Sequence, residues 1–251
     1  MLKTPTADKL KSLRLTGMLK GFEAQMTSSE YDSLLFEERL GLLVDLEAEE
    51  RENRRRQMLL KQAKLRQPAS MENLDYSGQR GLDRSLMDSL YTGNWIKDSL
   101  HLLITGPTGV GKSYLACALA HRACQLGYRC RYFRVSRLFE ELKVAAGDGR
   151  YAKMMGQIAR QHLIILDDWG LSALNERERR DLLEIFEDRD GHGSTIIAGQ
   201  LPVEHWYELI GNPTLADAIL DRVVHNAHRI ELKGDSMRKR RKKKLQKSEE
   251  S

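Results

Sequence analysis

Cysteine, proline and aromatic residues are scarce in this chain, which has 3 Cys, 5 Pro and 6% aromatic residues among 251. Three cysteines are too few for a disulfide framework, and no Cys-x-x-Cys pair is present to hold zinc. We expect Cys117 and Cys124, seven residues apart in one helical segment, to be small buried side chains in a reducing compartment. The composition therefore excludes a disulfide-stabilised or zinc-based module.

Long apolar runs are lacking as well. Runs such as Leu102–Ile104 and Leu163–Leu166 are far shorter than the roughly 20 residues that a membrane-spanning helix needs. The N-terminal sequence MLKTPTADKLKSL has no apolar stretch of the length found in a signal peptide. These absences predict a cytoplasmic protein without a membrane partner.

The charge is unevenly distributed. Of the 41 Lys and Arg and 36 Asp and Glu, residues 238–251 hold eight bases and two acids, which leaves 33 bases and 34 acids in residues 1–237. The basic excess is thus a tail. Residues 23–50 hold nine acids and one base, and residues 51–66 hold seven bases and one acid. Blocks of like charge often serve interactions.

The chain divides into three segments. Residues 1–66 have a helical apolar pattern and predict a small all-α domain of two to four helices. The stretch RQPASMENLDYSGQRGLDRS is rich in Pro, Ser, Gly and Asn and indicates a linker into a larger domain, residues 67–237. Residues 238–251 predict a basic, disordered tail.

Apolar strand-like runs alternate with helical patterns in the larger domain. Strands are expected at 100–105, 130–135, 163–167, 195–198 and 228–232, and helices at 112–126, 137–146, 151–161, 176–189 and 214–225. Such alternation is typical of an α/β fold, a parallel sheet covered by helices on both faces. We therefore predict a five-stranded parallel sheet.

The segment GPTGVGKS matches the phosphate-binding pattern G-x-x-x-x-G-K-[ST], and it lies between an apolar run and a helical pattern, as that loop requires. Its glycines permit backbone conformations that bring N–H groups close to phosphate. Lys112 can reach the β- and γ-phosphates of ATP, and the Ser113 hydroxyl can bind Mg²⁺. The predicted nucleotide-binding residues are Gly106, Pro107, Thr108, Gly109, Val110, Gly111, Lys112, Ser113 and Tyr114.

Two adjacent aspartates end the apolar run LIILDD. Neighbouring carboxylates repel each other and lose solvation when buried, unless a cation offsets the cost. We expect Asp167 to hold Mg²⁺ and Asp168 to orient or deprotonate the attacking water. The alternatives are a turn-forming role for Asp167, and a helix-capping or supporting role behind the site for Asp168.

Four segments together resemble the IstB family of transposition helper ATPases. They are the phosphate loop, the run from Leu163 to Trp169, IIAGQLPVEHW, and LADAILDRVVHNAHRIELKGDSMRK. The resemblance covers nearly the whole chain. It implies the AAA+ class of P-loop ATPases, in the initiator branch that also contains the DnaC helicase loaders.

The resemblance implies three further roles. Gln200 would act as the polar sensor between the water and the γ-phosphate, although most of the class has Asn there. Arg222 would be an arginine finger supplied to the ATP of a neighbouring subunit, and Arg238 a second sensor arginine within its own subunit. The alternatives are a surface Arg222 paired with Asp217 or Asp221, and an Arg238 that only begins the basic tail.

Three basic regions are candidates for DNA binding: the N-terminal helical segment, the insert between the second and third strands, and the tail. The candidate contacts are Arg51, Arg54, Arg55, Lys143, Arg150 and Lys153. None of these segments has the pattern of a base-reading motif, so contacts to the DNA backbone with little sequence preference are expected. Each region could instead be a solvated charged surface, and the acidic block at 23–50 could pack against the first.

The sequence thus predicts an ATPase that helps a transposase engage target DNA. ATP would assemble subunits into a homo-oligomer on duplex DNA, and hydrolysis would reset the assembly. Two alternatives remain open, a DnaC-like helicase loader and a nucleotide-gated DNA-binding scaffold with little turnover.

Overall fold

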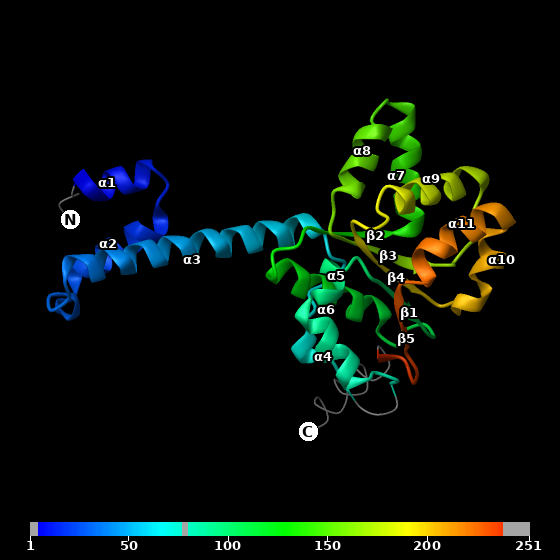
Figure 1. Cartoon of the computed structure of the whole chain (residues 1–251), viewed down its shortest axis with the longest axis horizontal. Coiled ribbons are helices and arrows are strands. Elements are labelled where there is room, and N and C mark those ends of the chain that lie inside the picture. Colours follow the sequence, from blue (N-terminus) through cyan, green and yellow to red (C-terminus); the bar gives the residue numbers. More distant parts are fainter. Residues whose placement is uncertain (1–4, 77–79, 238–251) are drawn as a thin grey trace, which may run out of the picture. The chain divides into compact units, whose positions relative to one another are not determined.

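The computed structural model describes residues 5–76 and 80–237, which fall into two compact units, Met1–Met58 and Leu59–Ser251 (Figure 1). Helix α3 (Phe36–Ala63) carries the chain from the first unit into the second. The sequence placed the boundary after residue 66. The division falls earlier because Leu59 and Ala63 are buried in the core of the second unit. The predicted basic tail, 238–251, lies outside the described residues.

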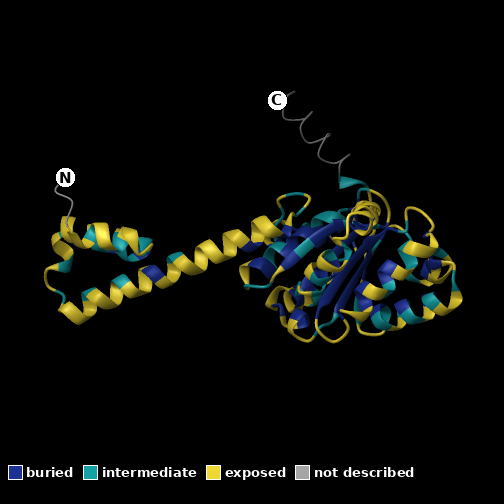
Figure 2. Cartoon of the chain, turned by 90° about the horizontal axis from the view of Figure 1, so that it is seen from above, coloured by how far each residue is buried: buried dark blue, intermediate teal, exposed yellow. Residues whose placement is uncertain are grey.

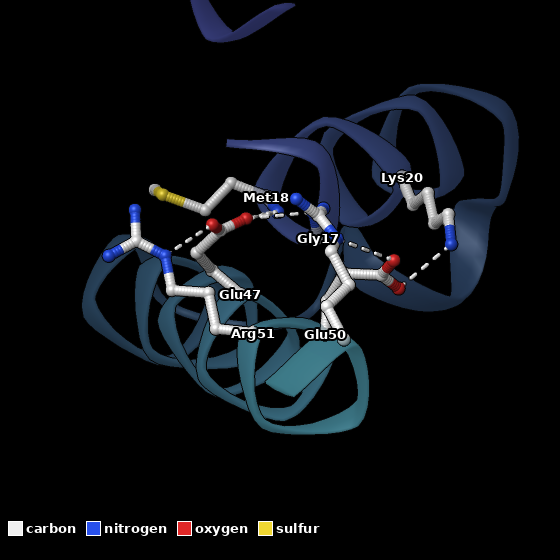
Figure 3. Close-up of polar contacts among 7 residues, drawn as sticks. Gly17, Met18, Lys20, Glu47, Glu50 and Arg51 are labelled. Carbon is white, nitrogen blue, oxygen red and sulfur yellow. Dashed lines mark hydrogen bonds and ion pairs between the residues drawn. The ribbon is translucent and has the colours of Figure 1, made fainter. Parts of the chain in front are cut away.

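The first unit is helical, as predicted. It contains α1 (Pro5–Ser12), α2 (Thr16–Thr27), the 3₁₀ turn η1 (Ser29–Tyr31) and the greater part of α3. Helix α2 packs directly on the backbone of α3, because Gly17 has no side chain. The Glu47 carboxylate is buried there and accepts hydrogen bonds from the backbone N–H groups of Gly17, at 2.8 Å, and Met18, at 3.3 Å (Figure 3).

The closeness of α2 and α3 gives a stability prediction. A Cβ atom at position 17 of α2 would lie 2.3 Å from the carbonyl oxygen of Leu46, whereas one at Gly41 of α3 would meet nothing within 4 Å. We expect Gly17→Ala to destabilise this unit by about 1–3 kcal/mol through overpacking. The control, Gly41→Ala, should stabilise it by up to about 1 kcal/mol through helix propensity. Hydrogen-exchange protection of the α2 and α3 amides measures both, and equal protection in the two variants would contradict the prediction.

The second unit is built on one five-stranded parallel sheet, as predicted. Its strands are β1 (His101–Thr105), β2 (Cys130–Arg134), β3 (Leu163–Trp169), β4 (Ser194–Gly199) and β5 (Ala227–Glu231), in the order β2-β3-β4-β1-β5. Successive side chains point to opposite faces, so Leu102 and Ile104 join one apolar core while Leu103 joins the other. Burial on both faces explains why the central strands β1, β3 and β4 are nearly continuous apolar runs.

Helices cover both faces of the sheet. They are α4 (Arg84–Thr92), α5 (Asn94–Lys97), α6 (Lys112–Gln125), α7 (Val135–Gly147), α8 (Tyr151–Ala159), α9 (Glu176–Glu187), α10 (Trp206–Ile210) and α11 (Pro213–Val224), with 3₁₀ turns η2 (Met71–Asn73) and η3 (Val203–His205). Helices α4, α5 and α6 share one core, and α7 to α11 share the other. The central strands β1, β3 and β4 are almost wholly buried (Figure 2), whereas the edge strand β5 is mostly half-buried or exposed. None of the described helices has the length and apolar character needed to cross a membrane.

Candidate nucleotide-binding site

The predicted phosphate loop connects the end of β1 to the start of α6. Gly106, Gly109 and Gly111 all have positive φ angles, at 140°, 86° and 105°. Helix α6 begins at Lys112, directly after Gly111. The loop therefore brings backbone N–H groups and a helix N-terminus together at the carboxyl edge of the sheet, an arrangement that binds anions.

The outer side of the loop is held by residues far away in the sequence. A Cβ atom at position 106 would lie 2.1 Å from the Leu232 carbonyl oxygen, and the Met237 N–H donates to the Gly109 carbonyl at 2.9 Å. The buried Arg80 donates from Nη2 to the Val110 carbonyl at 2.6 Å. The sequence offered no signal for Arg80, since a lone arginine beside a linker matches no pattern.

Lys112 lies across the mouth of the loop. Its Nζ donates to the Gly106 carbonyl at 2.7 Å and to the Pro107 carbonyl at 2.8 Å. Burial lowers the pKa of Lys112, and the negative charges of Asp167 and Asp168 oppose that change. The ammonium group is thus held by the backbone where phosphate oxygens would meet the loop.

The paired aspartates lie at the end of β3, and a β-bulge turns both into the site. Adjacent residues in a regular strand point to opposite faces, but the pairing with β4 shifts between Asp167 and Trp169. Asp168 has a φ of 61°, an uncommon left-handed conformation for a residue other than glycine. Such strain is often found at functional sites. Asp167 is 1% exposed, while the Asp168 side chain is 24% exposed.

Three side chains that the sequence analysis did not identify contact these carboxylates. Arg66 Nη1 lies 3.1 Å from Asp167 Oδ2 and 3.5 Å from Asp168 Oδ2. Tyr132 donates its hydroxyl hydrogen bond to Asp167 Oδ2, and Arg134 Nε donates to Asp168 Oδ2 at 2.8 Å. Burial and the contact with Asp167 raise the pKa of Tyr132, so it remains a neutral donor. These partners offset the repulsion between the two aspartates.

The loop and the aspartates line one pocket of about 450 Å³, within the size range of small-molecule sites. Of the predicted residues, Thr108, Gly109, Gly111, Lys112, Ser113, Tyr114, Asp167, Asp168 and Gln200 line it. Gly106, Pro107 and Val110 are not among the lining residues and shape the loop instead. The remaining lining residues are Arg66, Gln67, Asn73, Leu74, Asp75, Arg80, Trp169, Leu171, Ala198, Gly199 and Met237.

The donor set of this pocket fits ATP with Mg²⁺. Ser113 and Asp167 offer a hydroxyl and a carboxylate oxygen on the same wall. The described part of the chain has no group of three or more His, Cys, Asp or Glu side chains suited to a metal ion. Mg²⁺ is commonly held by one or two protein ligands together with substrate phosphates and water. The site therefore suits a cation that arrives with a nucleotide.

Arg222 lies on α11 and is not among the residues that line this pocket. Its Nη2 is 3.2 Å from Glu187 Oε1, and its Nη1 donates to the Ala218 carbonyl at 2.7 Å. Its acidic partner is thus on α9, and not Asp217 or Asp221 as the alternative reading had it. Arg238 lies outside the described residues, although its neighbour Met237 lies against the phosphate loop.

The candidate DNA contacts are distributed over both units. In the first unit, Arg51 and Arg54 pair with Glu47 and Glu50, one turn earlier in α3, and Arg55 is exposed. The acidic and basic blocks thus meet within one helix, and Figure 3 shows Lys20 of α2 also reaching Glu50.

In the second unit the contacts lie on the α7–α8 insert. Lys143 and Lys153 are exposed, and Arg150 pairs with Asp148. Arg150 and Lys153 line a shallow groove together with Glu140 and Glu141. The surface of the α7–α8 insert therefore carries basic side chains next to acidic ones.

The sequence of this chain is similar to those of known insertion-sequence proteins. The chain is 52% identical to an insertion-sequence ATP-binding protein of Sinorhizobium fredii, over 97% of this chain and all of that protein. It is 48% identical to the ATP-binding protein of insertion sequence IS1162 of Pseudomonas fluorescens, over 80% of this chain and 88% of that one.

Solved structures share the fold at 20% identity. The DnaC helicase loader covers 64% of this chain and 96% of its own with a TM-score of 0.52, and AMPPCP-bound DnaA from Aquifex aeolicus covers 73% and 56% with a TM-score of 0.56. At this identity the likeness shows a shared fold. The pattern of the IstB-like ATP binding proteins matches residues 8–245. The chain therefore belongs to the IstB-like family of insertion-sequence ATP-binding proteins.

Proposed function

We propose that this protein is an ATP-hydrolysing, DNA-binding helper of a transposase. The observation that carries the proposal is the pocket in which a phosphate loop faces two aspartates turned inward by a β-bulge. A site that only binds a nucleotide needs the phosphate loop. A second carboxylate, placed where the phosphates would bind, suits the activation of water for hydrolysis. The family's link to insertion sequences supports the transposase as the partner.

The phosphate loop, the two aspartates and Gln200 each have a role in this proposal. The loop N–H groups and Lys112 bind the phosphates, and Ser113 and Asp167 hold the cation. Magnesium, when bound, neutralises charge that develops on the phosphate oxygens. Asp168 accepts a proton from the attacking water, and Gln200 at the end of β4 orients that water.

In an oligomer, a neighbouring subunit would complete the ATP site. Arg222 is exposed enough to contact another subunit, with 29% of its side chain accessible, and it is not part of its own pocket. We infer that it contacts the ATP of a neighbouring subunit, where an added arginine stabilises the transition state. Turnover would then depend on oligomerisation.

A DnaC-like helicase loader is the alternative that the fold allows. Relatives associated with insertion sequences match nearly the full length at 52% identity, whereas the helicase loader matches at 20%, which supports the transposase role. Co-purification with each candidate partner separates the two. Capture of a replicative helicase, and not of a transposase, would favour the loader.

The basic insert gives a prediction for DNA binding. Replacing Lys143, Arg150 and Lys153 by alanine should weaken duplex binding equally across sequences and reduce the salt slope of log K by about 2 to 3, because each phosphate contact contributes about 0.9. A filter-binding salt titration with ATP measures this slope. The matched control replaces Lys97, Arg177 and Arg180, which are exposed bases elsewhere in the same unit. An unchanged slope in the insert variant would contradict the assignment.

Phosphate release tests the proposed activity itself. We expect ATP hydrolysis that increases when duplex DNA is added. DNA binding that requires ATP but releases no phosphate would instead identify a nucleotide-gated scaffold.

A further inference from the structure

The arginine that contacts both aspartates belongs to a segment outside the motifs of the site. Arg66 follows α3 by three residues, and its contacts with Asp167 and Asp168 span about a hundred positions of sequence. The phosphate loop, β3 and β4 all belong to the sheet and its connections, whereas Arg66 arrives from the end of a long helix. Its presence at the site needs a separate explanation.

The two arginines at the site have different partners. Arg134, at the end of β2, donates to Asp168 at 2.8 Å and stays close to its own strand. Arg66 Nη1 approaches Asp167 at 3.1 Å, on the same Oδ2 atom that accepts the Tyr132 hydrogen bond. Asp167, the predicted Mg²⁺ ligand, is thus neutralised by Arg66, and Asp168 is neutralised chiefly by Arg134.

The Arg66 contact competes with a cation. A divalent ion held by Asp167 draws on the same carboxylate, which already accepts two hydrogen bonds at one oxygen. A guanidinium and a divalent cation at one carboxylate repel each other, most strongly where water is scarce, and Asp167 is 1% exposed. Lys112 adds another positive charge on the same wall. The site therefore favours one cation beside Asp167 at a time.

The Arg66 side chain is partly exposed, with 35% of its surface accessible. It contacts the two aspartates and the hydroxyl of Tyr132, which is itself a partner of Asp167. The helix before it is anchored separately, because Leu59 and Ala63 are buried and Arg131 Nη1 donates to the Gln62 carbonyl at 3.0 Å. Helix α3 ends at Ala63, and Lys64 has a left-handed φ of 49°. Release of Arg66 would therefore leave the helix end in place, and the packing of Leu65, Ala69 and Met71 against the core would still hold the segment after this turn.

We propose that Arg66 holds the place of the cation at Asp167 and that a magnesium–nucleotide complex must displace it to bind. Arg66 then lowers the affinity of the site for Mg²⁺, because the cation must first break the contact between Arg66 and Asp167. This inference rests on the proposed magnesium-dependent function, and it goes further by assigning a role to a residue outside every motif.

Nucleotide affinity with and without Mg²⁺ tests the proposal. The affinity of the full chain for fluorescent ADP is measured in Mg²⁺ and in EDTA, for the wild type, Arg66→Ala, Arg66→Gln and the control Lys61→Ala. We expect both Arg66 variants to bind about 5-fold more tightly in Mg²⁺, as loss of a partly exposed ion pair implies, and to match the wild type in EDTA. Lys61→Ala, which removes an exposed base near the end of α3, should match the wild type in both conditions.

Three outcomes would overturn the inference. Unchanged affinity in Mg²⁺ would show that Arg66 does not compete with the cation. Weaker binding in both conditions would show that Arg66 is a ligand of the phosphates. A wild type that binds ADP equally well in Mg²⁺ and EDTA, with all variants alike, would remove any role for the cation while leaving nucleotide binding intact. Absence of ADP binding by the wild type would instead contradict the proposed function, and the inference with it.

Discussion

The Asp168→Asn variant should bind ATP and assemble as the wild type does, while its phosphate release falls by about 10²- to 10⁴-fold. Asparagine keeps the size of the side chain and an oxygen that can accept the hydrogen bond from Arg134. It loses the ability to take a proton from water. Single-turnover phosphate release, together with nucleotide affinity in the same samples, separates chemistry from binding.

Asp167→Asn is the matched control for that experiment. The two residues are adjacent and line the same pocket, but Asp167 is the predicted cation ligand. We expect this variant to weaken binding of ATP in Mg²⁺ as well as hydrolysis. Normal turnover in Asp168→Asn would return Asp168 to a supporting role, since its contact with Arg134 could serve only to neutralise the pair.

Arg222→Ala should reduce turnover by about 10³- to 10⁵-fold while leaving nucleotide binding to its own subunit intact. The side chain lies on α11, and it is not among the residues that line the pocket of the same chain. A loss of this size therefore requires the arginine to act on another subunit. The measurement is the hydrolysis rate per subunit at saturating ATP and at several protein concentrations.

Mixing two inactive variants tests the action between subunits directly. Arg222→Ala keeps its pocket, whereas Lys112→Ala keeps its arginine. If Arg222 acts in trans, a mixture of the two should regain activity, because Lys112→Ala subunits supply the arginine. Glu187→Gln is the control, since it removes the acidic partner and leaves Arg222 in place. No recovery in the mixture, or activity per subunit that stays constant down to monomer concentrations, would exclude this role.

Sequence patterns predicted the framework of the second unit well. The five strands and the five predicted helices begin within a few residues of their predicted positions, because the central parallel strands are nearly continuous apolar runs, whereas the shorter helices α4, α5 and α10 were not predicted. The phosphate loop was predicted equally well, because each of its glycines is needed for the backbone conformation at its own position. The apolar run of a strand and the glycine pattern of a loop are both properties of short segments, so the sequence of each segment is enough to predict them.

The remaining parts of the site depend on contacts between distant segments. Arg66 and Tyr132 meet at Asp167, and nothing in the sequence near any of them indicates the other two. The β-bulge that turns Asp168 inward is a property of the pairing between β3 and β4, which a single strand sequence does not specify. The unit boundary was also placed late, because the burial of Leu59 and Ala63 depends on the core they enter.

The outer wall of the phosphate loop has a consequence for how the protein is made. Strand β5 pairs with β1, and the segment after β5 packs on the loop, so the last described residue, Met237, holds Gly109. During synthesis on the ribosome, the phosphate loop is made well before β5 and the segment after it, which support the loop. We expect the pocket to mature only after the segment from β5 to Met237 has been synthesised, and a chain interrupted before β5 to retain the phosphate-loop sequence without a working site.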